Sequence, residues 1–137
     1  KAVDVSDSTD VVITHAHHDH IECVKYFRNA VVHIQEDEYS KGERYLEDHP
    51  CVCTFSAEAM IDDGVKVVKV GGHSLGSCVV ECTMGEKICV LCGDECYSLR
   101  NIREQIPTAR SYSPENSKAF IEKYTQGSYE CLLCHDL

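Results

Sequence analysis

Blocks of apolar residues alternate with polar blocks along the chain, and this pattern predicts strands interleaved with helices. Runs rich in β-branched residues are typical of strands, and they occupy residues 10–14, 30–35, 65–70, 78–83, 87–92 and 129–134. The fourth and fifth runs are joined by "MGE", so Gly85 is expected in the turn of a hairpin. Strands that alternate with helices predict an α/β layered domain.

Three stretches between these strands are expected to be helical. A short helix is predicted at residues 21–28, and the charged segment 36–48 is expected to form a helix that faces solvent. A third helix is predicted to begin after Ser113, which is a favoured N-cap before proline, and to stop at Gly127. The chain has 137 residues and shows no repeat or linker, so we expect one domain over 1–137.

Composition and charge narrow the classes of function. The chain has 43% hydrophobic and 26% charged residues, which is ordinary for a globular protein, and a net charge of −10. This negative charge disfavours nucleic acid as a partner, because phosphate binding normally needs a basic surface. No apolar run reaches the roughly 18 residues of a membrane span, so no membrane association is expected.

The ten cysteines raise the question of a thiolate metal site. Two C-x-x-C pairs, Cys89 with Cys92 and Cys131 with Cys134, have the spacing of a zinc ribbon. Their spacers are apolar and lie in predicted strands, where residues three apart face opposite sides of the sheet. We therefore expect ordinary buried thiols. So many free thiols favour a reducing compartment, which predicts a cytoplasmic protein.

Side chains that commonly bind metals follow the predicted strands. The stretch "THAHHDH", Thr14 to His20, places four histidines and an aspartate after the first strand, and three later strands are also followed by histidine or aspartate. Residues at corresponding strand ends converge on one rim of an α/β domain, so we expect a single site there. The candidate ligands are His15, His17, Asp19, His20, His73, Asp94 and His135.

The spacing of these ligands suits two ions. His15 and His17 lie two apart, so from an extended segment they can bind one ion, with His73 as the third ligand. Imidazole and carboxylate without thiolate favour Zn²⁺, with Mn²⁺ or Fe²⁺ as alternatives. An open two-metal site lowers the pKa of a bound water to near neutrality and polarises a substrate carbonyl, which predicts a hydrolase of small molecules.

A second set of residues can bind the second ion. Asp19 and His20 lie past the bend in the chain and can reach a second ion together with His135. Asp94 has two carboxylate oxygens, so it can bridge the two ions. The seven residues therefore predict two divalent ions in one centre.

The motifs "THAHHDH", "GGHSLGS", "CGDE" and "CHD" resemble, in the same order, those of the metallo-β-lactamase superfamily, and the resemblance covers nearly the whole chain. It implies an αββα sandwich with the site along one edge of two sheets. It also implies one ligand set: His15, His17 and His73 for the first metal, Asp19, His20 and His135 for the second, and Asp94 as the bridge.

Tyr97 points to one branch of this family. It stands three residues after Asp94, an arrangement similar to that of the N-acyl-homoserine lactonases, in which the phenol hydrogen-bonds the substrate carbonyl. The resemblance implies that Tyr97 stabilises the oxyanion and that Asp19 passes a proton to the leaving alkoxide. The expected reaction is attack of a dinuclear-metal hydroxide on the carbonyl of a small ester or lactone. A thioesterase similar to glyoxalase II, or a non-catalytic metal-binding fragment, stays as an alternative.

Other branches and the length of the chain also bear on the resemblance. True class B β-lactamases commonly have a cysteine at the position of Asp94, so antibiotic hydrolysis is not favoured. The nuclease branches insert a large domain and prefer polyanions, which the net charge of −10 disfavours.

The family domain begins with several strands before its first histidine motif, whereas here the motif starts at His15, so we expect an N-terminally truncated, partial domain. If Lys1 were the natural start, a partner would have to cover the exposed sheet, for example a second copy in a homodimer.

Overall fold

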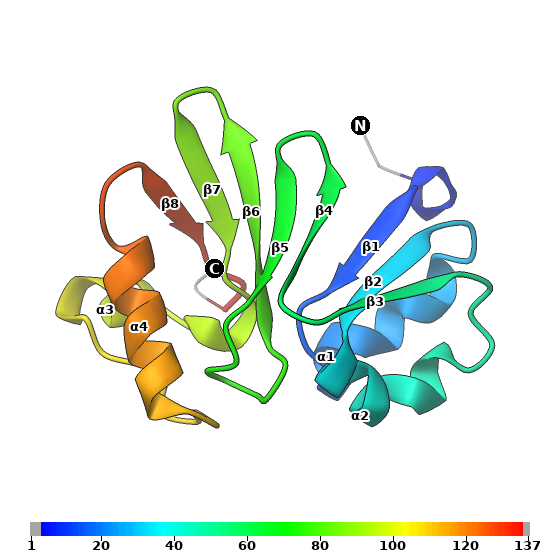
Figure 1. The fold of residues 1–137 in the computed structure, drawn as a ribbon, viewed down its shortest axis with the longest axis horizontal. Coiled ribbons are helices and arrows are strands. Elements are labelled where there is room, and N and C mark those ends of the chain that lie inside the picture. Colours follow the sequence, from blue (N-terminus) through cyan, green and yellow to red (C-terminus); the bar gives the residue numbers. More distant parts are fainter. Residues whose placement is uncertain (1–3, 136–137) are drawn as a thin grey trace.

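The computed structural model describes residues 4–135. Two β-sheets pack against each other, and each has helices on its outer side (Figure 1). The first sheet is parallel, in the order β1 (Asp10–Ile13), β2 (Val31–Gln35), β3 (Val52–Phe55). The second has the order β4 (Glu58–Asp62), β5 (Val65–Lys69), β6 (Cys78–Met84), β7 (Lys87–Leu91), β8 (Tyr129–Leu132). This architecture confirms the predicted αββα sandwich.

The helices lie on the outer sides of the sandwich (Figure 1). Three helical segments pack outside the first sheet: α1 (His18–Ile21), the 3-10 helix η2 (Glu22–Tyr26) and α2 (Glu36–Leu46). Outside the second sheet lie α3 (Leu99–Glu104) and α4 (Pro114–Tyr124). Two further 3-10 turns are η1 (Val5–Asp7) and η3 (Gly93–Glu95). Among the described residues, no helix is both long enough and apolar enough to span a membrane.

The structure confirms some of the predicted helix bounds and contradicts others. Helix α4 begins as expected, because the Ser113 side chain accepts a hydrogen bond from the Asn116 N–H. It ends at Tyr124, before Gly127, which adopts a φ of 68° in the turn that follows. The helix predicted at residues 21–28 is wrong in register and type, since α1 begins at the histidine motif and continues as 3-10 helix.

Strands β3 and β4 were not predicted from the apolar pattern. Both lie at sheet edges, and β4 exposes every second residue in "EAMID", so its run of apolar residues is short. Their strand conformation depends on pairing, β3 with β2 and β4 with β5. The hairpin between β6 and β7 is as predicted, with Gly85 at a φ of 67°.

The apolar core has three layers, one outside each sheet and one between them. The outer layers pack α4 on the second sheet and α1 with α2 on the first, whereas the layer between the sheets centres on Phe55, Val67 and Cys78. Because β5 and β7 both pair antiparallel to β6, and β8 runs parallel to β7, their carboxyl ends meet at one edge. The end of β1 reaches the same edge, where the Thr14 carbonyl accepts a hydrogen bond from the Cys78 N–H.

Candidate metal centre

Six of the seven predicted ligands gather at this edge. Their ligand atoms form two groups, in each of which the atoms lie within 4.8 Å of one another, and the two groups share Asp94. The first group consists of His15, His17, His73 and Asp94, and the second of His20, Asp94 and His135. Apart from Asp19, which was predicted for the second group, each residue lies in the group that the sequence spacing predicted.

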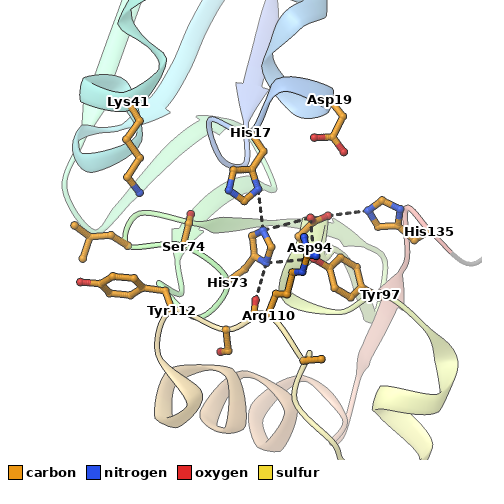
Figure 2. A pocket seen from close by; sticks show the side chains of 13 residues that line it. His17, Asp19, Lys41, His73, Ser74, Asp94, Tyr97, Arg110, Tyr112 and His135 are labelled. Atoms are coloured by element: carbon orange, nitrogen blue, oxygen red, sulfur yellow. Dashed lines mark hydrogen bonds and ion pairs between the residues drawn. The ribbon is translucent and has the colours of Figure 1, made fainter.

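The carboxylate of Asp94 faces both groups, one oxygen to each. Its Oδ2 lies 3.6 Å from Nε2 of His15 and 3.4 Å from Nε2 of His73. Its Oδ1 lies 3.1 Å from Nε2 of His20 and 2.9 Å from Nε2 of His135. Figure 2 shows Asp94 between His73 and His135. This geometry fits a carboxylate that bridges two cations.

Burial and neighbouring charges set the protonation of these groups. Burial, with the nearby His20 ring second, lowers the pKa of His15 to about 3. Burial also lowers the pKa of His73. Burial would raise the pKa of Asp94, but hydrogen bonds from His20 and His135 outweigh it and hold that pKa below its usual value. At neutral pH His15 and His73 are therefore neutral and Asp94 is ionised, whereas the hydrogen bond to Asp94 raises the pKa of His20.

The first group also contains a buried nitrogen atom without a hydrogen-bond partner in the described part of the chain. Nε2 of His15 is buried and has no hydrogen-bond partner among the described residues, which is costly for a polar nitrogen. His73 donates a hydrogen bond from Nδ1 to the Arg110 carbonyl at 3.1 Å, which directs its Nε2 toward Nδ1 of His17, 3.1 Å away. Imidazole nitrogens that converge with a carboxylate oxygen are the ligands that Zn²⁺ and related ions prefer. The residues present therefore fit a divalent metal.

Asp19 is the predicted ligand that lies outside both groups. Its side chain is 68% exposed, and its Oδ2 lies 3.6 Å from Nε2 of His20. It lines the same cavity as the clustered ligands, as Figure 2 shows. Its roles as a ligand and as a proton donor stay predictions.

Tyr97 lies beside the first group. Its phenol oxygen is 3.3 Å from Oδ2 of Asp94 and 3.4 Å from Nδ1 of His73. Burial and the charge of Asp94 raise the pKa of Tyr97 to about 12, so the phenol keeps its proton at neutral pH. Tyr97 is thus a hydrogen-bond donor at the wall of the cavity.

A cavity of about 900 Å³ opens directly onto the ligands. Figure 2 shows its wall opposite His135, where Lys41 and Tyr112 lie. The complete lining consists of His17, Asp19, Lys41, His73, Ser74, Leu75, Asp94, Tyr97, Ala109, Arg110, Ser111, Tyr112 and His135. A small organic molecule fits a space of this size.

Two buried carboxylates that the sequence did not single out hold the histidine loops. The first is Glu38, whose side chain is 1% exposed. Its Oε2 accepts a hydrogen bond from the Ala16 N–H at 2.8 Å, and its Oε1 accepts from the Ser74 hydroxyl at 2.7 Å and the Gly76 N–H at 2.9 Å. Helix α2 was expected to face solvent as a whole. That expectation is wrong on this side, because Glu38 ties α2 to both histidine loops.

The second carboxylate is Glu95, which is fully buried next to the bridging Asp94. Its Oε1 accepts hydrogen bonds from the Gly72 and His73 N–H groups, both at 3.1 Å, and from the Ser77 hydroxyl. A Cβ at Gly72 would collide with Oε2 of Glu95, so a glycine is required there for the close approach. Glu95 thereby fixes the backbone of the loop that presents His73.

The Glu38 network predicts a specific acid sensitivity. Burial would raise the pKa of Glu38, but hydrogen bonds from Ala16, Lys41 and Ser74 outweigh it and lower that pKa from 4.5 to about 2. A carboxyl with a lowered folded-state pKa contributes stability that is present above its unfolded pKa and is lost as the pH falls through the folded value. We expect the difference in unfolding free energy between wild type and Glu38→Gln to shrink from pH 5 to pH 2. Urea titrations across this range measure it, and a difference that stays constant would contradict the prediction.

The cysteines form no comparable site. Among the described residues, no group of three or more thiols lies close enough together to hold a metal. All ten cysteines are free. Of the four cysteines in the two C-x-x-C pairs only Cys92 is buried, whereas Cys89 and Cys131 are partly buried and Cys134 is exposed, so the expectation that all four are buried is wrong.

Known proteins resemble this fold and this sequence. The sequence profile of the metallo-beta-lactamase superfamily matches residues 1–134. A crystal structure of a quorum-quenching N-acyl homoserine lactone hydrolase superposes with a TM-score of 0.81 at 19% identity, over 98% of this chain and 60% of that one. A probable metal-dependent hydrolase from Staphylococcus aureus gives 0.80 at 22% identity, over 96% and 56%.

A putative metallo-beta-lactamase from Thermotoga maritima gives a TM-score of 0.74 at 20% identity, over 98% of this chain and 70% of that one. No curated protein matches by sequence. The chain thus spans less than two thirds of the length of the lactone hydrolase and of the Staphylococcus protein. Because the family profile matches almost the entire chain, this chain belongs to the metallo-beta-lactamase superfamily.

Proposed function

We propose that this protein is a metal-dependent hydrolase that cleaves a small ester or lactone. The observation that carries the proposal is the shared carboxylate of Asp94, which presents one oxygen to each of two histidine groups at the wall of a cavity. Two divalent ions, with zinc favoured by the donor set, would lower the pKa of a water and polarise a carbonyl when bound. The ten free thiols support a cytoplasmic location.

The residues around the ligands have separate roles in this proposal. Hydrolysis adds water across the acyl C–O bond, so negative charge develops on the carbonyl oxygen and the leaving alkoxide needs a proton. Tyr97 keeps its proton at neutral pH and donates a hydrogen bond to the developing oxyanion. Asp19 lines the cavity, so its carboxylate can take up the proton that the attacking water loses and pass it to the leaving alkoxide.

A substrate panel with metal analysis tests the proposal. The whole encoded protein is loaded with Zn²⁺, Mn²⁺ or Fe²⁺ and assayed with matched lactones, oxyesters and thioesters. We expect lactone or oxyester hydrolysis that a chelator abolishes and added metal restores. Activity on thioesters alone would support the thioesterase alternative. Two tightly bound metals without any hydrolysis would indicate a non-catalytic metal-binding module.

The Tyr97→Phe substitution removes the phenol hydroxyl and keeps the aromatic ring, so it tests the hydroxyl alone. The hydroxyl lies at the cavity wall beside Asp94 and His73, so its removal is expected to lower kcat by about 10²-fold, the usual effect of losing one oxyanion donor. Metal content should stay at the wild-type level, because the hydroxyl belongs to neither ligand group. The matched control is Tyr112→Phe, another tyrosine of the same cavity. Equal effects of the two substitutions on kcat would show that the Tyr97 hydroxyl has no special role in the reaction.

A further inference from the structure

We infer that the substrate carries an anionic group, a carboxylate or a phosphate, in addition to its scissile bond, and that the guanidinium of Arg110 binds this group. The inference rests on the proposed function, since it concerns the substrate of the same cavity. It follows from where Arg110 is held and from which charges line the cavity.

Arg110 is held at the cavity by its own backbone. Its carbonyl accepts a hydrogen bond from Nδ1 of His73 at 3.1 Å. The residues that follow are fastened to the same loop: the Ser111 hydroxyl donates to the Gly72 carbonyl at 3.1 Å, and the Tyr112 N–H donates to the His73 carbonyl at 3.3 Å. The position of Arg110 is therefore linked directly to a metal-ligand loop.

Of the two cationic side chains that line the cavity, one forms an ion pair with a described residue and the other does not. Apart from the predicted metal ligands, the lining contains two charged side chains, Lys41 and Arg110. Nζ of Lys41 lies 2.9 Å from Oε1 of the buried Glu38, so its charge is neutralised. The guanidinium of Arg110 has no ion pair or hydrogen bond with any described residue. Arg110 is thus the one cation of this lining without an ion pair among the described residues, although the chain as a whole has a net charge of −10.

Several other residues of the wall carry a hydroxyl group. Ser74, Tyr97, Ser111 and Tyr112 line the cavity together with Leu75 and Ala109. Guanidinium presents a planar fork of donors that matches the two oxygens of a carboxylate or phosphate. An acyl compound with an anionic group therefore matches the donors of Arg110 at this wall.

Three nitrophenyl esters of equal length, ending in a carboxylate, a phosphate or a carboxamide, test the inference on the metal-loaded whole protein. We expect wild type to prefer at least one anionic ester over the carboxamide by about 10-fold or more in kcat/KM, mainly through KM. Arg110→Gln should bring this ratio close to one, and Arg110→Lys should keep part of it. The control is Arg103→Gln, an exposed arginine of α3 outside the cavity, which should leave the ratio at its wild-type value.

The two anionic esters show which anion is the ligand, and the controls separate this inference from the proposed function. Hydrolysis without preference for charge, or a preference that survives Arg110→Gln, overturns the inference and leaves the hydrolase intact. If no ester is cleaved, calorimetric titration with a short dicarboxylate and with inorganic phosphate decides. Binding that Arg110→Gln weakens about 10-fold supports the anion site while the hydrolase fails, and binding that is equal in both proteins overturns the inference too.

Discussion

Asp94→Asn is expected to abolish hydrolysis, with a loss of at least about 10³-fold in kcat/KM, and to reduce the bound metal from two ions per chain to one or none. The two oxygens of Asp94 face different histidine groups, and among the described residues Asp94 alone belongs to both ligand groups. The amide of asparagine offers one neutral oxygen in place of two charged ones, and this weakens attraction to a pair of dications. Several kcal/mol of transition-state stabilisation depend on the metals, which corresponds to about 10³-fold or more in rate.

Metal analysis by mass spectrometry and steady-state kinetics measure the two effects together. Asp63→Asn is the matched control, because Asp63 is exposed in the turn after β4 and belongs to neither ligand group. It should keep both metals and full activity. A wild-type metal content in Asp94→Asn would mean that Asp94 is not the bridge, whatever the effect on rate.

Glu38→Ala is expected to lower the free energy of unfolding by about 3–5 kcal/mol, the usual effect of removing one partner from a buried charged network. The substitution leaves the Ala16 and Gly76 N–H groups without their acceptor and unpairs Lys41. It also releases both histidine loops from α2, so metal affinity should fall together with stability.

Urea unfolding of the apo and metal-loaded protein measures this effect. Glu43→Ala provides the comparison, since Glu43 lies on the same helix but is exposed, and it should change stability by less than about 0.5 kcal/mol. A loss below about 1 kcal/mol in Glu38→Ala would show that water can replace the carboxylate as the acceptor. Glu38→Gln should give an intermediate value, because its amide oxygen accepts hydrogen bonds without the charge.

The resemblance to the superfamily and the geometry support each other at particular residues. His15, His17 and His73 were assigned to one ion by their spacing, and their ligand atoms lie together. The same holds for His20 with His135, whereas Asp19, assigned by the same reasoning, is turned largely toward solvent. Spacing places a residue at a strand end, but the rotation of the short helix α1 decides which of its side chains reach the centre.

The residues that support the site could not be identified in the same way. Glu38 and Glu95 have no distinctive neighbours in the sequence, and each lies in a stretch that also contains exposed acids or metal ligands. Their importance comes from burial together with hydrogen bonds to loops about 20 to 40 positions away in the chain. The same is true of Arg110, which enters the cavity because its carbonyl binds His73, 37 positions away.

By itself, the sequence determined the order of most strands, the family and six of the residues that gather at the candidate centre. These depend on short-range patterns: the alternation of apolar residues and the types of side chain that follow each strand. Tertiary structure alone decided that β3 and β4 pair as edge strands, that one side of α2 is buried, and that Arg110 lines the same cavity as the candidate ligands. These features depend on contacts between distant segments, and their free energy exists only once the two sheets have packed together.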